Sequence, residues 1–172
     1  GVSAKGNVVI FDDEHYYMGG VLAEKLRLEK LAVLLVTPAP DISNWTHKTM
    51  EQRRIQSRLL EIGVDIATQQ NLVSVNSEEV ELACVFTDRR TRRDCDTLVL
   101  VTERKPNDQL YHILQAKKEE ITEAGIKTFQ CIGDCFVPGI IAASVHSGHL
   151  AAREFEGDSS EDVPFKRERV VV

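Results

Sequence analysis

The sequence has no long apolar run, few cysteines and no excess of basic residues, and each shortage excludes a class of protein. No apolar stretch approaches the roughly 18 residues that a transmembrane helix needs, and no signal-peptide pattern is present. Lysine and arginine number 21 against 27 acidic residues, and the net charge of −6 disfavours nucleic acid or an anionic membrane as a partner. No methionine precedes Gly1, which predicts a trimmed product or an excised fragment. The apolar fraction of 42% is sufficient for a globular core.

Four cysteines in 172 residues are too few for a disulfide framework. Cys131 and Cys135 have no second pair nearby, and His146 and His149 lack a third ligand, so we expect no metal site. Free thiols are typical of a reducing compartment, which indicates the cytoplasm. No Ser–His–Asp, Cys–His or paired-carboxylate arrangement stands out, so no catalytic residue is assigned.

Glycine is missing where a dinucleotide-binding fold needs it most. Residues 8–11 predict a buried strand, residues 18–26 an amphipathic helix and residues 31–36 a second strand. This order predicts a βαβ unit. In nucleotide-binding units the first turn reads G-x-G-x-x-G, so that backbone N–H groups and the helix N-terminus can hold a pyrophosphate.

Carboxylates occupy that turn instead: Asp12, Asp13 and Glu14. Two like charges about 4 Å apart repel by roughly 4 kcal/mol at an effective dielectric near 20. The second strand also ends without the acidic residue that would hold a ribose. The sequence therefore predicts a degenerate nucleotide turn that does not bind NAD. One of the two aspartates is expected either to cap the following helix or to lie in a solvated turn.

The next segment predicts a helix and an antiparallel hairpin. Residues 49–52 have the spacing of a capping box and open the helix, and Gly63 ends it. Strands are expected at residues 64–67, 72–76 and 81–87. The charged segment 88–94 contains four arginines and is expected to be a solvated loop.

A second series of strands and helices is expected from residue 97 onward. The pattern predicts a strand at 97–102, a helix at 107–125, a strand at 128–132 and a helix at 139–155. Residues 157–162 are acidic and predict a linker that precedes a short tail. Asp134 lies between a predicted strand and a predicted helix, which is the edge of a sheet where ligands bind.

Several motifs in this order resemble a known group of flavoproteins. Residues 97–102, followed by Arg104 and Pro106, are similar to the crossover between the pyridine-nucleotide and flavin lobes of disulfide-reductase-like enzymes, although Glu103 stands where that motif has glycine. Residues 131–135 and 148–153 look like the later Gly-Asp segment of the same fold. The resemblance is more specific to the trimethylamine dehydrogenase family, which includes dimethylamine and histamine dehydrogenases. It rests on the carboxylate turn and on residues 16–18, 23–26 and 163–168.

The resemblance implies an α/β fold in three parts. Residues 1–96 would be a Rossmann-like, pyridine-nucleotide-disulfide-reductase-type lobe with an antiparallel β-hairpin insertion and a degenerate nucleotide site. Residues 97–156 would be the C-terminal return of a flavin- or ADP-binding-like lobe, as a partial second α/β unit, and residues 157–172 a linker and tail.

The resemblance also implies a function. Members join an FMN-binding TIM barrel and a 4Fe–4S cluster to a two-lobed C-terminal region that can hold ADP. This chain is then expected to be a non-catalytic, structural module of such an amine dehydrogenase, without a cofactor of its own. Its partners would be the TIM barrel and flavin-like lobe of the parent, a second copy of the chain in a homo-oligomer and, for the parent, an electron-transfer flavoprotein. Contacts on the ADP side would come from Gly133, Asp134 and Gly139.

Three alternatives remain open. One is a free-standing adaptor that keeps the fold without redox chemistry. A 2,4-dienoyl-CoA reductase-type fragment would use NADPH, against which the carboxylate turn argues. A receiver domain of a signalling protein also begins with an acidic pair and carries a late Lys-Pro, here Lys105 and Pro106. A receiver needs a phosphoaccepting aspartate at the end of its third strand, whereas Asp65 lies inside the predicted strand.

Overall fold

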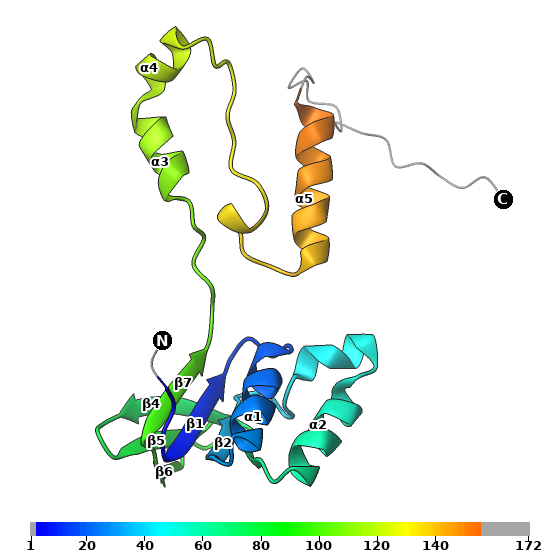
Figure 1. Ribbon diagram of the computed structural model, residues 1–172, viewed down its shortest axis with the longest axis vertical. Helices are drawn as coiled ribbons and strands as arrows, with labels where there is room; N and C mark the ends of the chain where they lie inside the picture. Colours follow the sequence, from blue (N-terminus) through cyan, green and yellow to red (C-terminus); the bar gives the residue numbers. More distant parts are fainter. Residues whose placement is uncertain (1–2, 156–172) are drawn as a thin grey trace, which may run out of the picture. The chain divides into compact units, whose positions relative to one another are not determined.

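The computed structural model describes residues 3–155, and the chain divides into two compact units, Gly1–Glu103 and Arg104–Val172 (Figure 1). Each unit is described by itself. Among residues 3–155, no helix is both long and apolar enough to cross a membrane.

A four-stranded parallel sheet forms the centre of the first unit. Its strands lie in the order β3 (Asp65–Ala67), β2 (Ala32–Val36), β1 (Asn7–Asp12) and β7 (Thr97–Val101). Helix α1 (Met18–Leu28) connects β1 to β2, which pair in parallel with Val9 opposite Leu34. The βαβ unit predicted from the apolar periodicity is therefore confirmed.

A 3-10 helix and an α-helix connect β2 to β3. The 3-10 helix η1 comprises Asn44–Thr49, and α2 comprises Gln52–Glu61. The expected capping box is wrong, because α2 begins at Gln52 and its N-cap residue Glu51 makes no side-chain cap hydrogen bond. Glu51 instead accepts a hydrogen bond from the hydroxyl of Tyr17. Gly63 follows α2 with a φ of +80°, which confirms the predicted helix end.

An antiparallel sheet follows β3. It contains β4 (Gln70–Val75), β5 (Glu79–Cys84) and β6 (Arg90–Asp94) in that order. The loop expected at 88–94 is wrong in its larger part, since Arg90–Asp94 pairs with β5. Cross-strand ion pairs favour this strand: Arg90 lies 2.9 Å from Glu81, and Arg92 lies 3.1 Å from Glu79.

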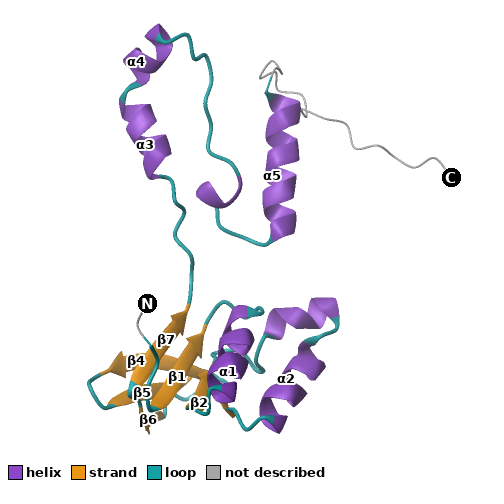
Figure 2. Ribbon diagram, viewed as in Figure 1, coloured by secondary structure: helices purple, strands orange, loops and turns teal. Residues whose placement is uncertain are grey.

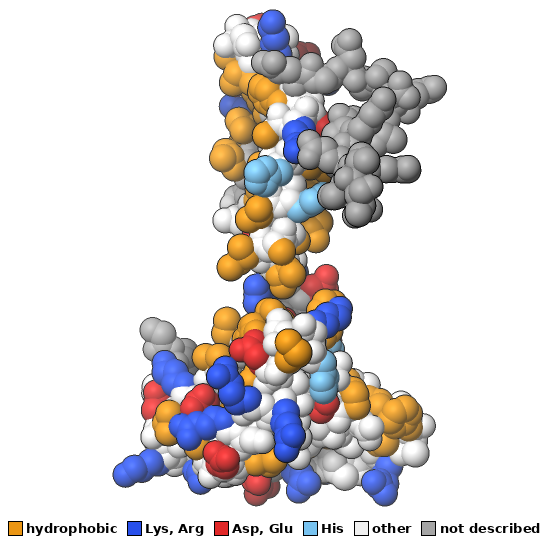
Figure 3. Space-filling view, turned by 90° about the vertical axis from the view of Figure 1, so that its right-hand side faces the viewer, with side chains coloured by type: hydrophobic (Ala, Val, Ile, Leu, Met, Phe, Trp, Pro, Cys, Tyr) orange, Lys and Arg blue, Asp and Glu red, His pale blue; other side chains and the backbone are white. Residues whose placement is uncertain are grey.

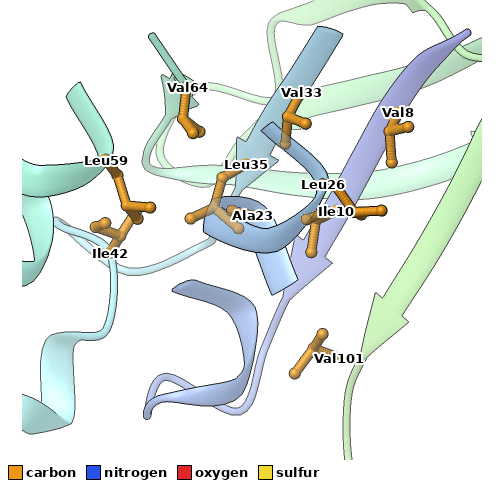
Figure 4. Close-up of a cluster of buried hydrophobic side chains, with 10 residues drawn as sticks. All are labelled: Val8, Ile10, Ala23, Leu26, Val33, Leu35, Ile42, Leu59, Val64 and Val101. Carbon is orange, nitrogen blue, oxygen red and sulfur yellow. The ribbon is translucent and has the colours of Figure 1, made fainter. Parts of the chain in front are cut away.

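Two apolar clusters cover the two faces of the parallel sheet. Because side chains alternate along a strand, Val8 and Ile10 face α1 and α2, whereas Val9 faces the antiparallel sheet. Figure 4 shows the first cluster between the helices and the sheet. The members of that cluster are Val8, Ile10, Ala23, Leu26, Val33, Leu35, Ile42, Leu59, Val64 and Val101. The second comprises Val9, Val36, Val80, Leu82 and Cys95.

The first unit extends past the lobe boundary expected between residues 96 and 97. Strand β7 pairs in parallel with β1, with Ile10 opposite Val99. Val101 is buried in the first cluster, and Leu98 packs against the second. The compact unit therefore includes β7, while the 96/97 division between functional lobes stays a prediction.

The described part of the second unit is helical (Figure 2). It contains α3 (Gln109–Ala116), α4 (Lys118–Glu123), the 3-10 helix η2 (Gly133–Cys135) and α5 (Ile141–Glu154). The single helix expected at 107–125 is interrupted at Lys117, where ψ is +34°. The strand expected at 128–132 is wrong: residues 104–155 contain no strand, and a β-strand needs a neighbour for its backbone N–H and C=O groups. The expected linker and tail at 157–172 lie outside the described residues.

Candidate functional sites

The first candidate site is the turn that follows β1. Asp12, the last residue of that strand, is fully buried. Its Oδ1 accepts hydrogen bonds from the backbone N–H groups of Glu14 and His15, both at 3.1 Å. A carboxylate oxygen that accepts from N–H groups two and three residues ahead closes a turn on itself. Two backbone N–H groups of this turn are thus already bound by Asp12.

The other oxygen of Asp12 has no hydrogen-bond partner among residues 3–155. This Oδ2 is buried and lies against α1, where a Cβ added to Gly19 would approach it to 2.5 Å. Burial raises the pKa of Asp12, more than its two backbone hydrogen bonds lower it. The carboxylate therefore fills the space between the strand end and the first turn of α1, and a glycine is required at position 19.

The expectation that one of the aspartates caps α1 is wrong. The N-cap residue of α1 is Tyr17, which makes no side-chain cap hydrogen bond, and the donors to Asp12 belong to the turn. Asp13 is exposed, and its backbone N–H donates to the carbonyl oxygen of Val101 at 2.8 Å. Glu14 is half-buried in the same turn.

His15 extends across the ends of two strands. Its φ of +63° places it in the left-handed region, which few residues other than glycine adopt. Its ring lies 3.3 Å from Asp13 through Nε2 and 3.4 Å from the hydroxyl of Thr37 through Nδ1. Its carbonyl accepts a hydrogen bond from the backbone N–H of Trp45 at 2.9 Å. Thr37 directly follows β2, where a dinucleotide-binding unit would place its ribose-binding acid, so His15 covers that position with a protein side chain.

The raised pKa of Asp12 predicts a pH-dependent stability difference. A carboxyl group whose pKa is higher in the folded state stabilises the fold below its ordinary pKa and loses that contribution as the pH rises through the folded value. Asp12→Asn keeps an oxygen for the two backbone donors and removes the buried charge. We expect its melting temperature to match the wild type near pH 4 and to exceed it by roughly 3 °C near pH 8, a shift that corresponds to about 1 kcal/mol in a protein of this size. Thermal melts of both proteins across this range measure the difference, and a difference independent of pH contradicts the assignment.

The second candidate site is the turn at η2 in the second unit. Oδ1 of Asp134 accepts hydrogen bonds from the hydroxyl of Ser144 at 2.8 Å and from the backbone N–H of Gly139 at 3.2 Å. These two hydrogen bonds lower the pKa of Asp134, and the one from Ser144 has the larger effect. The N–H of Gly133, whose φ is +61°, donates to the hydroxyl of Ser147 at 3.0 Å. The structure thus brings Gly133, Asp134 and Gly139 together at the start of α5.

Ser144 and Ser147 were not singled out in the sequence. The available signal was their spacing of three on a helix rich in small residues, which puts both hydroxyls on one face. Asp134 is exposed, its hydrogen bonds from Ser144 and Gly139 both use Oδ1, and the positive charge of Arg104 also lowers its pKa; an exposed carboxylate of this kind can accept a hydrogen bond from a ribose or ribityl hydroxyl. The residues present fit a sugar hydroxyl at this turn.

The remaining histidines and Trp45 occupy exposed positions. His146 and His149 line a small pocket of about 280 Å³ on α5 with Leu150 and Arg153. Within residues 3–155 no three metal-ligating side chains come together. Trp45 is half-exposed under the ammonium group of Lys48, and His47 pairs with Asp41 at 2.7 Å.

Comparison with known proteins relates the chain to part of much larger enzymes. Residues 3–97 match the family described as the OYE-like second alpha/beta domain. The chain is 30% identical to dimethylamine dehydrogenase of Hyphomicrobium sp. (strain x), in an alignment that covers 94% of this chain and 24% of that protein. Histamine dehydrogenase from Rhizobium sp. 4-9 is 39% identical with a TM-score of 0.90, over 98% of this chain and 26% of the other. The 6-hydroxypseudooxynicotine amine oxidase from Pseudomonas geniculata N1 is 31% identical with a TM-score of 0.81, over 88% and 22%. The chain therefore spans about a quarter of the length of these relatives.

Proposed function

Because this chain belongs to the OYE-like second alpha/beta domain family, within the C-terminal region of the trimethylamine dehydrogenase family, we propose that it is a non-catalytic module of a larger amine dehydrogenase. The resemblance expected from the sequence motifs is confirmed by these relatives. The observation that carries the proposal is an alignment that covers nearly the whole chain and about a quarter of the length of each relative. These relatives are enzymes named for their action on amines. The catalytic FMN and the 4Fe–4S cluster would belong to other parts of the parent.

The first unit would serve as a Rossmann-like lobe whose nucleotide site is closed. Asp12 holds the turn N–H groups, and His15 covers the end of β2. A dinucleotide phosphate would have to displace hydrogen bonds to a buried carboxylate and meet the charges of Asp13 and Glu14. These contacts favour a structural role for this lobe over coenzyme binding.

The second unit would complete a lobe to which other parts of the parent contribute. Ile121 is the single buried apolar residue among residues 104–155. Large apolar side chains are exposed on α3 and α5, including Leu110 at 68% and Ile141 at 84% exposure, and hydrophobic side chains spread over the visible surface of this unit (Figure 3). Surfaces of this kind are contact surfaces. The flavin-like lobe of the parent is the proposed partner, with Asp134 and its neighbouring glycines on the side that would bind ADP; self-association into a homo-oligomer is a second use of the same surface.

The receiver and dienoyl-CoA reductase alternatives differ in what they require of the turn that follows β1. The receiver hypothesis is set aside, because the chain belongs to a flavoenzyme family and β3 leads into an antiparallel sheet rather than a further βα repeat. A dienoyl-CoA reductase-type parent would need NADPH, which the closed turn argues against.

The proposal is tested on the enzyme encoded by the complete reading frame. We expect the purified protein to show FMN and iron–sulfur absorbance, to reduce an artificial acceptor or an electron-transfer flavoprotein with a small amine, and to show no saturable binding of NADH or NADPH. The amine-linked reaction is proposed from the relatives alone. Micromolar NADPH binding or NADPH-driven flavin reduction would support the dienoyl-CoA alternative and overturn the proposal.

The ADP contact is tested in the same preparation with a pair of aspartate variants. Asp134→Ala removes the carboxylate beside α5, whereas Asp13→Ala changes an exposed carboxylate in the other unit. We expect ADP binding to weaken about tenfold in the first variant, because one charge-assisted hydrogen bond contributes roughly 1.5 kcal/mol, and to stay unchanged in the second. Equal ADP affinity in both variants contradicts the contact while leaving the amine dehydrogenase proposal standing.

A further inference from the structure

Two cysteine sulfurs meet at the turn that carries Asp134. The Sγ atoms of Cys131 and Cys135 lie 3.2 Å apart, and both residues are half-buried. Cys131 also directs its thiol to the carbonyl oxygen of Cys135 at 2.9 Å, and the thiol of Cys135 approaches the carbonyl of Ile132 at 3.0 Å. The three residues between the cysteines include Gly133 and Asp134.

The other two cysteines are arranged differently. Cys84 is the last residue of β5, and Cys95 directly follows β6 and is buried in the second apolar cluster. Cys95 is held beside the start of β5 by a hydrogen bond from its N–H to the carbonyl of Glu78, at the opposite end of that strand from Cys84. These two cysteines therefore cannot meet without unfolding the sheet.

From this geometry we propose that Cys131 and Cys135 are a redox-modification site, which forms a reversible intrachain disulfide by exchange with a low-molecular-weight disulfide. A bound metal ion is a poorer occupant, because no third ligating side chain joins the pair among residues 3–155. Adjacent, partly accessible thiols are the arrangement in which one cysteine attacks and the other resolves the mixed disulfide.

The order of attack follows from the hydrogen bond between the sulfurs. Cys131 donates its S–H to Cys135, and this contact raises the pKa of Cys131 to about 11. Cys131 therefore keeps its proton, and the Cys135 sulfur, which accepts the hydrogen bond, is the better placed nucleophile. The thiolate of Cys135 attacks one sulfur of the external disulfide, whose S–S bond breaks and releases one thiolate.

The second step closes the ring. Cys131 loses its proton to solvent or to the released thiolate and attacks the Cys135 sulfur, so that the mixed disulfide breaks and a second external thiol leaves. Two protein thiols are oxidised and one external disulfide is reduced to two thiols. The new ring contains Gly133 and Asp134, so the modification constrains the turn to which we assign the ADP contact. Only that consequence rests on the proposed function; formation of the disulfide does not.

The test uses the 172-residue chain and oxidised glutathione as the probe. After native oxidation and an acid quench, the protein is denatured, alkylated and mapped by mass spectrometry. We expect Cys84 and Cys95 to be alkylated, and the peptide with Cys131 and Cys135 to lack two hydrogens until it is reduced with dithiothreitol. Alkylation of all four cysteines, a stable glutathione adduct on Cys131 or Cys135, or a disulfide that joins either of them to Cys84 or Cys95 overturns the proposal.

Single variants test the order of attack. Cys131→Ser leaves the attacking sulfur without its resolving partner, so a glutathione adduct should accumulate on Cys135. Cys135→Ser removes both the attacking sulfur and the hydrogen bond that raises the pKa of Cys131, so the two thiols are ranked in the wild type. A brief exposure followed by the acid quench should trap the mixed disulfide on Cys135. A mixed disulfide trapped on Cys131 overturns the assigned order. The thiol map requires no nucleotide, so a failure here is distinguishable from a failure to bind ADP.

Discussion

Gly19→Ala is expected to lower the free energy of unfolding by roughly 1–3 kcal/mol, the cost of overpacking a close-packed site. In an exposed helix the same change is stabilising by about 1 kcal/mol, because glycine is a poor helix former. Here the new methyl group would lie 2.5 Å from Oδ2 and 2.8 Å from Cβ of Asp12. Asp12 is fully buried and held by two backbone donors, so it cannot move aside cheaply. Urea unfolding followed by circular dichroism measures the loss.

The neighbouring glycine provides a matched control. A Cβ at Gly20 would lie 3.4 Å from Cγ2 of Ile55 and 3.4 Å from Oγ of Ser43, at the edge of ordinary contact. Gly20→Ala should therefore change the free energy of unfolding by less than about 1 kcal/mol. In an Asp12→Ala background the cost of Gly19→Ala should fall in part, because the carboxylate group that it meets is gone and only the contact with Cβ at 2.8 Å remains. A Gly19→Ala protein as stable as the wild type, or an equal cost in both backgrounds, contradicts the close contact.

The sequence was sufficient to predict the carboxylate turn but not which carboxylate is buried. Three acids in a row look alike in composition, and all three repel a phosphate. The distinguishing signal was the phase of the strand, since Val8, Ile10 and Asp12 alternate onto one face and the first two face the helices. Burial of Asp12 follows from that phase, whereas its effect on Gly19 depends on the distance between β1 and α1, which no local pattern encodes.

The arginine-rich strand shows why a charged segment was mistaken for a loop. All five residues of β6 are exposed, so the apolar alternation that indicates a strand is absent. The signal lay in the partner: Glu79 and Glu81 alternate along β5 and pair with Arg92 and Arg90. Complementary charge between two segments is a pairwise property and becomes visible only when their register is known.

The second unit was predicted least well, for a different reason. Helix α5 agrees with the predicted helix, and Asp134 precedes it as predicted, but Asp134 lies in a 3-10 helix and not at the edge of a sheet. The strand expected at 128–132 depends on neighbouring strands, and the described part of this unit supplies none. Local propensity cannot determine a strand whose backbone partners lie elsewhere.

A chain that ends at Glu103 is expected to unfold cooperatively, whereas one that ends at Asp96 is expected to have no cooperative transition. The shorter chain lacks β7 and therefore the parallel partner of β1. It also loses buried Val101 and partly buried Leu98 and Val99 from the two apolar clusters, and full burial of one such side chain contributes about 1.5–3 kcal/mol. Their sum of roughly 3 kcal/mol or more is a large fraction of the stability of a small domain. Thermal and urea unfolding of both chains measure the contrast.

The experiment distinguishes two boundaries for the first unit, one at residue 96 and one at Glu103. The family match ends at residue 97 and the lobe predicted from the resemblance ends at residue 96, but the backbone places β7 inside the sheet of the first unit. A control of equal length keeps the backbone of β7 and replaces its apolar contacts: the chain that ends at Glu103 with Val99→Ser and Val101→Ser should lose several kcal/mol of stability. Cooperative unfolding of the chain that ends at Asp96, at the melting temperature of the longer one, would show that β7 belongs energetically to the second lobe. If the chain that ends at Asp96 has no cooperative transition and the longer chain has one, then β7 completes the sheet of the first unit.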